Sequence, residues 1–154
     1  ASRSVGRENN IIKLAIKNSF HIFLPTHFPK LESIYYLCHV NDTAMNPKFK
    51  VVYTEEAYEF IYSLPEKVQD KIAYNITKST FFMDKELFKK LDNSDIWEFR
   101  TLYSGTAYRL LAFWDTDKDT LVIATHGFIK KTQKTPLKEI AKAEMIRKEY
   151  FNSK

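Results

Sequence analysis

The feature that most constrains this chain is a series of three strand-like runs joined by two short turns in its second half. The runs cover 96–103, 107–114 and 120–126, and the turns read SGT and DTDKD. Connections this short between extended runs favour hairpins, in which successive strands lie antiparallel and side by side. The chain is therefore expected to contain an antiparallel-rich sheet.

Alternation within these runs assigns side chains to opposite faces of the expected sheet, because residues i and i+2 of a strand share a face. Arg100 and Arg109 fall on the face that does not hold Trp97 and Phe99. The third run, TLVIATH, is almost wholly apolar, which is typical of a central strand. Five aromatic residues are expected to pack in or beside the core: Trp97, Phe99, Tyr108, Phe113 and Trp114.

The flanking segments predict one further strand and three helices. A strand is expected over 48–53, a helix capped by Thr54 up to about residue 63, and a helix over 65–80 that begins at a proline. Thr135 and Pro136 begin a final helix that runs to about residue 151, and 82–95 reads as a polar connection. The resulting order, β-α-α-β-β-β-α, predicts a small α+β domain with its helices packed on one face of the sheet.

A change in pattern near Met45 divides the chain into two parts. Residues 45–154 form the expected domain, whereas 1–44 show no sustained periodicity and are expected to be a weakly structured leader or artificial extension. Met45 is then a candidate start of the natural protein. The alternative is a genuine extension that docks as a helix around 8–20, where apolar residues have helical spacing.

The remaining composition points to the cytoplasm. The only cysteine, Cys38, excludes an internal disulfide, and its spacing from the histidines of 1–44 matches no standard zinc pattern, so no metal or other cofactor is expected. No stretch of 18 apolar residues exists, so no membrane span is expected. With 154 residues, 44% of them hydrophobic, the chain is long enough for one buried core.

A basic cluster follows the third run, in the stretch HGFIKKTQKTP. It contains His126, Lys130, Lys131 and Lys134 without a carboxylate. From Lys118 to the end of the chain there are nine basic and four acidic residues, a balance of +5, which equals the formal net charge of the whole chain. This asymmetry favours a local site for a polyanion.

Arg100 and Arg109 are expected to converge with this cluster on one phosphate-binding surface. Arginine holds a phosphate with two parallel N–H groups, and Phe128 is a candidate platform for an unpaired base. His126 titrates near neutrality and is the candidate general base or acid. Simpler interpretations stay open: Arg100 pairs with Glu98 or with a carboxylate of 92–95, and His126 is a hydrogen-bonded structural residue.

Similar alternatives apply to the other cations. In the simpler interpretation, Arg109 pairs with Asp115 or Asp117, and Lys130 and Lys131 are an exposed charged edge that discourages aggregation. The glycine-rich phosphate loops and the G-x-S-x-G nucleophile motif are absent from the sequence.

Three segments resemble the HigB/RelE-type toxins of bacterial type II toxin–antitoxin systems, in their phage-derived HigB-like branch. They are KFKVVYTEEAYEFIYSL, LFKKLDNSDIWEFRTLYSGTAYRLLAFW and LVIATHGFIKKTQKTPLKEIAKAE, in that order. The resemblance covers about residues 48–151. It implies a RelE-like fold and a metal-independent endoribonuclease, an mRNA interferase that cuts messenger RNA in the ribosomal A site.

The resemblance also implies partners and roles. A helix-turn-helix antitoxin neutralises such a toxin, and the RNA 2′-hydroxyl attacks the adjacent phosphate. Arg100 and Arg109 match basic hairpin positions for phosphate binding and transition-state stabilisation, and Lys130 and Lys131 match basic residues after the last strand. His126 is the first candidate for proton transfer and Lys130 the second. The best-studied RelE-like members have a tyrosine late in the chain, and KTQKTP departs from them because it has none.

Overall fold

The computed structural model describes residues 47–118 and 121–154. The expectations about 1–44, including a start at Met45, a helix around 8–20 and the metal-binding potential of Cys38, lie outside the described residues. None of the helices in the described ranges is both long and apolar enough to cross a membrane.

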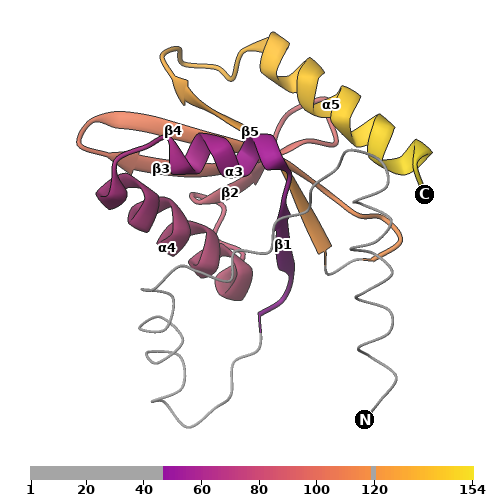
Figure 1. Ribbon diagram of the computed structural model, residues 1–154, viewed down its shortest axis with the longest axis horizontal. Helices are drawn as coiled ribbons and strands as arrows, with labels where there is room; N and C mark the ends of the chain where they lie inside the picture. The colour runs from indigo at the N-terminus through magenta and orange to yellow at the C-terminus, as the bar shows by residue number, and fades with distance from the viewer. Residues whose placement is uncertain (1–46, 119–120) are drawn as a thin grey trace, which may run out of the picture.

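The domain is built on one five-stranded sheet whose strands follow the order β1-β5-β4-β3-β2 (Figure 1). The strands are β1 (Lys50–Tyr53), β2 (Phe88–Lys90), β3 (Trp97–Tyr103), β4 (Thr106–Trp114) and β5 (Leu121–Lys130). β1 pairs with β5 in parallel, and the other three pairings are antiparallel. The antiparallel-rich sheet and the central position of the third run are thereby confirmed.

Within the described residues, three helices complete the α+β fold: α3 (Glu55–Tyr62), α4 (Glu66–Phe82) and α5 (Leu137–Asn152). The Thr54 hydroxyl accepts the backbone N–H of Ala57, which satisfies one donor of the first turn of α3, as expected for a cap. Thr135 makes no such bond at the start of α5, where Pro136 occupies the cap position.

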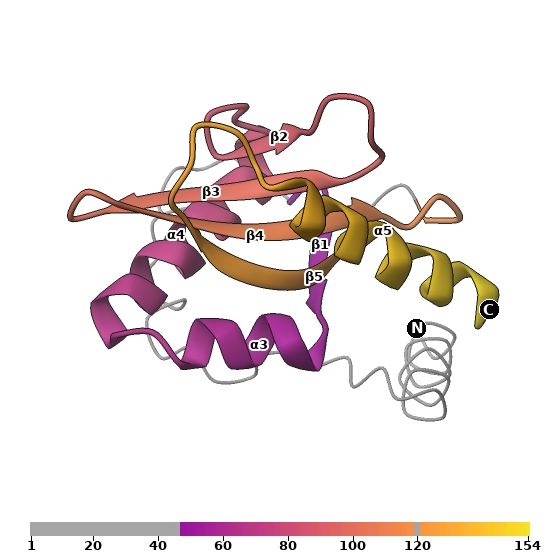
Figure 2. The same cartoon turned by 90° about the horizontal axis from the view of Figure 1, so that it is seen from above.

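The helices cover both faces of the sheet, and the expectation of a single covered face is wrong (Figure 2). Ala57 and Ile61 of α3 and Val68, Ile72 and Ile76 of α4 share one core with the face that carries Phe99 and Leu110. Ala143 and Tyr150 of α5 share a second core with Leu111 and Phe113. Consecutive residues of β4 are apolar, so the strand presents apolar side chains on both faces of the sheet. α5 covers those on the second face.

The turn between β3 and β4 is the short hairpin that the sequence indicated. Ser104 and Gly105 both have positive φ values, 48° and 77°, as the two central residues of a primed hairpin turn require. This geometry fixes the pairing so that Arg100 lies directly opposite Arg109. The two guanidinium groups therefore start from neighbouring positions on the same face.

β5 is longer than expected: it does not end near His126 but continues into the basic cluster as far as Lys130. A bulge interrupts its pairing with β4: Ala112 lies opposite Ala124, whereas Leu111 lies opposite His126, so Thr125 is the extra residue. Beyond the bulge, the strand carries Phe128 and Lys130 on the face of Arg109. The first part of the cluster is thus held by a sheet rather than by a loop.

The short strand β2 lies in the segment that was expected to be a polar connection. Phe88 is 2% exposed and stacks on Phe99 with ring centroids 4.2 Å apart, and it also stacks on Trp97. The pairing places Lys89 opposite Glu98, at the edge of the sheet. The burial of Phe88 against aromatic side chains of β3 therefore accompanies the pairing of this short strand with β3.

The C-terminal end of α5 is fixed to the turn after β4 by a buried carboxylate. Asp115 is 1% exposed, accepts the Tyr150 hydroxyl at 2.8 Å and pairs with the Lys154 ammonium at 2.6 Å. Burial would raise the pKa of Asp115, but the hydrogen bonds from Lys154 and Tyr150 hold it below its usual value. These contacts hold α5 over one end of the sheet face and leave the other end uncovered by a helix (Figure 2).

Candidate functional site

The uncovered end of this face carries a row of cations. Arg100 of β3 lies opposite Arg109 of β4, which lies opposite Phe128 of β5. Two residues further along β5, Lys130 lies opposite Ala107. Because side chains two apart share a face, the strand register places Arg100, Arg109 and Lys130 together, as the sequence predicted.

A buried carboxylate lies between the two arginines. Glu98 is 3% exposed, and its Oε1 atom lies 3.1 Å from Nε of Arg109 and 3.6 Å from Nε of Arg100. Arg100 therefore pairs with Glu98, one of the partners that the simpler interpretation named, although this carboxylate is buried rather than solvated. Arg109 pairs with Glu98 as well, and not with Asp115 or Asp117.

Both ion pairs depend on charge more than on directed hydrogen bonds. The Nε–H groups of Arg100 and Arg109 are buried but not aimed at an acceptor, although each lies within ion-pair distance of Glu98. Arg109 is 8% exposed, and one of its terminal nitrogens donates to the carbonyl of Tyr108 at 2.9 Å. The Arg100 side chain is 31% exposed, so it is the more accessible of the two.

The electrostatics of Lys130 show that it shares the same environment. Burial is the main cause that lowers the pKa of its ammonium group; Arg109, Arg100 and Lys89 lower it further, and Glu98 opposes them. Lys89 lies opposite Glu98 in the sheet and is exposed. Because burial and neighbouring cations disfavour its charged form, the ammonium group of Lys130 gives up its proton more readily than an exposed lysine does.

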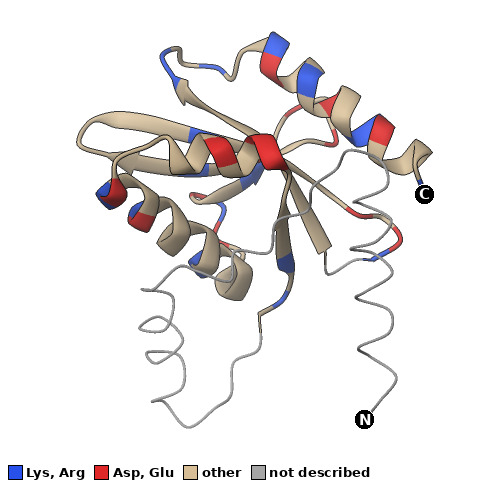
Figure 3. Cartoon of the chain, in the orientation of Figure 1, with Lys and Arg blue, Asp and Glu red and all other residues tan. Residues whose placement is uncertain are grey.

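The segment between β5 and α5 arches over this end of the sheet (Figure 2). Lys131 and Lys134 are exposed within it, and the Thr135 hydroxyl donates to Oε2 of Glu98 at 2.5 Å. Figure 3 shows blue segments along this arch, and the sequence from 130 to 136 contains no carboxylate. The sheet and the arch therefore form two walls of one positively charged surface.

His126 lies away from that surface. Its side chain is 2% exposed, with Nε2 3.0 Å from the carboxylate of Glu139 on α5 and Nδ1 3.1 Å from the Thr125 hydroxyl. Burial lowers the pKa of His126, and the bond to Glu139 only partly offsets this effect. The structure thus places His126 as a buried link between β5 and α5, which agrees with the simpler of the two interpretations.

Phe128 is half-buried and packs against the core beneath α5, with its ring centroid 6.4 Å from that of His126. It borders the cationic surface because it lies opposite Arg109. Among the aromatic residues expected in the core, Phe99 and Phe113 are buried, and Trp97, Tyr108 and Trp114 pack against buried residues. The core assignment of those five is therefore confirmed.

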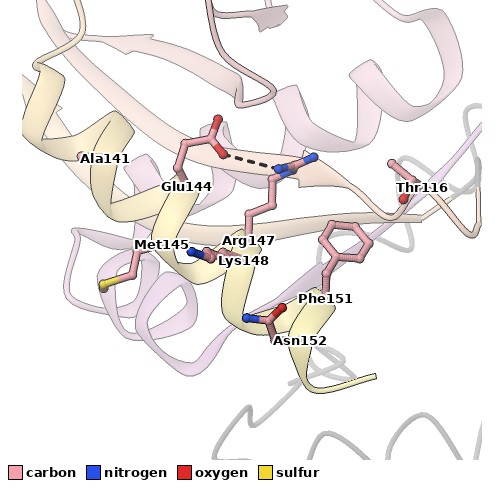
Figure 4. A pocket seen from close by; sticks show the side chains of 8 residues that line it. All are labelled: Thr116, Ala141, Glu144, Met145, Arg147, Lys148, Phe151 and Asn152. Carbon is pink, nitrogen blue, oxygen red and sulfur yellow. Dashed lines mark ion pairs between the residues drawn. The ribbon is translucent and has the colours of Figure 1, made fainter.

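A separate shallow groove of about 670 Å³ runs along the C-terminal half of α5 (Figure 4). Met145, Phe151 and the ion pair of Arg147 with Glu144, 3.5 Å apart, contribute to its lining. The expected site residues are not among those that line it. Within the described residues, no three histidine, cysteine or acidic side chains gather in a way that could hold a metal ion.

Three residues of the surface were not identified as site residues from the sequence. Glu98 was noticed only as one possible partner of Arg100, Thr135 only as a helix cap, and Lys89 not at all. The alternation of β3 already places Glu98 on the face of Arg100. The contributions of Thr135 and Lys89 depend on the arch and on β2, which no local pattern indicated.

A family model described as "Phage derived protein Gp49-like (DUF891)" matches residues 59–148. The match includes both arginines, Glu98 and the basic cluster. It confirms the phage-derived branch of the resemblance. No curated protein matches the chain significantly.

Solved structures of bacterial toxins are also similar to the chain at low identity. The intact Escherichia coli RelBE toxin–antitoxin complex has a chain that is 15% identical, with a TM-score of 0.44, over 55% of this chain and 99% of that one. A mutant of E. coli toxin RelE in the free state is 15% identical, with a TM-score of 0.48, over 66% and 98%.

A third structure, the RelBE2 toxin–antitoxin complex of Mycobacterium tuberculosis, is 19% identical, with a TM-score of 0.37, over 55% of this chain and 100% of that one. Similarity at this level carries no information about activity.

Proposed function

The chain belongs to the Gp49-like family of phage-derived proteins, and from this premise we propose that it is the toxin of a toxin–antitoxin system, an endoribonuclease that cuts messenger RNA on the ribosome. The observation that carries the proposal is the gathering of Arg100, Arg109 and Lys130 on the uncovered end of one sheet face. The membership and the charge of the surface support it together.

The chemistry needs no protein nucleophile. The RNA 2′-hydroxyl attacks the adjacent phosphorus, the bond from phosphorus to the 5′-oxygen breaks, and a 2′,3′-cyclic phosphate remains. The protein must hold the strand, stabilise the charge of the five-coordinate phosphorus and move two protons. A surface of arginine and lysine at a sheet face supplies the first two requirements.

The residues take different roles in this proposal. Arg100 contacts the reacting phosphate directly because its side chain is accessible, and the buried Arg109 on the neighbouring strand supplies positive charge. Lys130 donates a proton to the leaving 5′-oxygen, which its lowered pKa favours. Lys131 and Lys134 hold neighbouring phosphates, and Phe128 contacts a base at the edge of the surface.

The proposed site does not include His126, because its ring is 2% exposed and both nitrogens have partners in the fold. Its role as general base or acid stays a prediction from the sequence. The group that accepts the proton of the 2′-hydroxyl is then supplied from outside the described cluster, by the ribosome–RNA complex.

We also propose the partners that accompany such a toxin. The messenger RNA in the ribosomal A site is the substrate, and the ribosome orders the strand against Arg100 and Lys130. A helix-turn-helix antitoxin neutralises the protein by covering the cationic surface. This function places the protein in the cytoplasm.

A second candidate is a catalytically degenerate module that binds antitoxin or ribosome without cutting. The burial of His126 favours it, because the side chain that ordinarily titrates nearest neutrality does not reach the phosphate site. Only the first candidate predicts cleavage of messenger RNA, whereas the second predicts binding to the antitoxin or the ribosome alone.

Replacement of Arg109 tests the proposal. We expect induced expression of the parent chain to stop growth and to produce codon-linked cuts that primer extension detects in translated messages. Arg109→Gln should reduce cleavage by about a hundredfold or more, because removal of one charge-stabilising group from an active site has an effect of this order. Arg109→Lys should recover part of the activity, since it keeps the charge without the planar fork.

Lys67→Ala is the matched control, because Lys67 is an exposed cation of α4, which packs on the opposite face of the sheet. It should cut like the parent. Ribosome binding without cuts by the parent chain would favour the degenerate module. Full cleavage by an Arg109→Gln protein would show that the site lies elsewhere.

A further inference from the structure

Glu98 is the carboxylate at the centre of the cationic surface, and its surroundings are unusual for a simple salt bridge. One oxygen, Oε1, faces the Nε atoms of both Arg100 and Arg109, and the other, Oε2, accepts the hydroxyl of Thr135. The side chain is 4% exposed, so little water competes for either oxygen. Buried charges are tolerated where they are paired in this way.

The two arginines would repel each other without this carboxylate. They lie opposite each other on neighbouring strands and lower the pKa of the nearby Lys130. Like charges directly opposite in a sheet destabilise the pairing and drive side chains apart. A negative charge shared at 3.1 and 3.6 Å removes that repulsion and keeps both guanidinium groups on the same side of the surface.

The bond from Thr135 connects the same carboxylate to the second wall of the surface. Thr135 ends the arch that carries Lys131 and Lys134, and its contact with Glu98 joins residues 37 positions apart. The arch therefore has a fixed point on β3. Movement of this point would displace both lysines relative to Arg100.

We propose that Glu98 is the positioning residue of the RNA-cleaving site: it sets the two arginines and the lysine arch into one phosphate-binding geometry without touching the substrate. This inference rests on the proposed function. Glu98 is a negative charge inside an anion-binding site. Its proposed role is to increase the rate of the chemical step, and it does not increase the affinity for RNA.

The kinetics of two Glu98 variants on programmed ribosomes distinguish positioning from simple charge balance. Glu98→Gln removes a negative charge, so charge balance alone predicts equal or tighter RNA binding and a retained rate. Positioning predicts that kcat falls about a hundredfold while KM stays within about threefold, since a displacement of about 1 Å has effects of this order. Glu98→Asp keeps the negative charge but moves it away from the arginines, because the aspartate side chain is shorter. The value of kcat should therefore fall in this variant too.

Glu86→Gln is the matched control for the loss of one negative charge. Glu86 also lies near Arg100, at 3.9 Å, but its side chain is 89% exposed. Exposed pairs contribute little, so kcat should stay within about twofold of the parent. Thr135→Val provides a second variant with milder effects on folding, because it removes only the hydroxyl on Oε2, and it should lower kcat by about tenfold.

A second readout separates this inference from the proposed function. The Nε–H resonances of Arg100 and Arg109 in the nuclear magnetic resonance spectrum should shift in Glu98→Asp and Glu98→Gln and stay unchanged in Glu86→Gln. If the parent chain does not cut RNA, the proposed function fails, and these resonances alone decide whether Glu98 orders the arginines. Unchanged resonances, a retained kcat in both Glu98 variants, or an effect confined to KM would each overturn the inference.

Discussion

At the scale of single residues, the buried surroundings of His126 favour a structural role over proton transfer. Its ring lies between Thr125 and Glu139, within reach of the charges of Lys142 and Glu56. Burial is the largest effect on its pKa and lowers it, and the hydrogen bond to Glu139 opposes this effect. The fold therefore favours the neutral ring, which donates a hydrogen bond from Nε2 to the carboxylate.

This environment predicts a pH-dependent contribution to stability. The pKa of His126 in the folded protein is below the value of about 6.5 expected in the unfolded chain. At pH values between these two pKa values, the unfolded chain binds more protons than the folded protein. The contribution is fully present above about pH 6.5 and is lost as the pH falls toward the folded pKa. Urea unfolding should show His126→Gln to be less stable than the parent by about 1 kcal/mol at about pH 8, with the gap narrowing toward pH 5.

The same variant tests the catalytic interpretation of His126. Cleavage by folded His126→Gln should stay within about threefold of the parent, because the ring does not reach the phosphate site. A loss of more than a hundredfold with the fold intact would support His126 as the proton carrier that the sequence indicated.

At the scale of elements, the packing of α3 on β5 depends on a residue without a side chain. A Cβ atom at Gly127 would lie 1.9 Å from Cδ1 and 2.6 Å from Cγ of Phe60, a residue of α3. These atoms include the base of the ring, so Phe60 cannot avoid the contact by moving only its tip. Gly127 therefore allows α3 to lie close to the strand that carries Phe128 and Lys130.

Gly127→Ala should destabilise the domain by about 1–3 kcal/mol, the usual cost of an overfilled core, in thermal or urea unfolding. Phe60→Ala makes room for the added methyl group, so the double variant should lose less stability than the sum of the two single variants. Gly105 is the matched control: it has open space but a φ of 77°, and the effect of Gly105→Ala should not depend on Phe60. Additive effects of Gly127→Ala and Phe60→Ala would contradict the proposed contact.

The same elements show why sequence patterns predicted some of the fold and not the rest. Two short turns and strict alternation were sufficient for β3 and β4, including the shared face of Arg100 and Arg109. β2 was missed because its three residues gain stability from the stacking of Phe88, a contact between distant segments. The bulge at Thr125 and the second helical layer also depend on tertiary packing, which local patterns do not contain.

The candidate site could likewise be predicted only in part from the sequence. The cations were predictable because each lies on a strand with clear alternation or in a short run beside one. The central position of Glu98 was not, because it depends on three contacts from three different elements. His126 was assigned from its intrinsic pKa, and its burial became visible only when α5 was placed over the sheet.

At the scale of the whole molecule, the helices and the cationic surface occupy different parts of the sheet. α3 and α4 pack on one face, while α5 covers one end of the other face and the arch of 131–136 borders its remaining end (Figure 2). Charged groups of α5 and of the residues after it are occupied in part by contacts within the fold, such as Glu139 with His126 and Lys154 with Asp115. The lysines of the arch have no carboxylate beside them in the sequence, and in the proposed function they bind the phosphates of the RNA.

The salt dependence of RNA binding should report this localisation. Each phosphate neutralised by a cation contributes about 0.7 to the slope of log affinity against log salt for a single strand. Lys131→Ala should therefore reduce the magnitude of the slope by about 0.7, whereas Lys67→Ala, an exposed cation of α4, should leave it unchanged. Fluorescence anisotropy with a 2′-deoxy-substituted strand, which cannot be cut, measures binding alone. Equal reductions in the two variants would mean that RNA is attracted by the overall charge of +5 rather than by one surface.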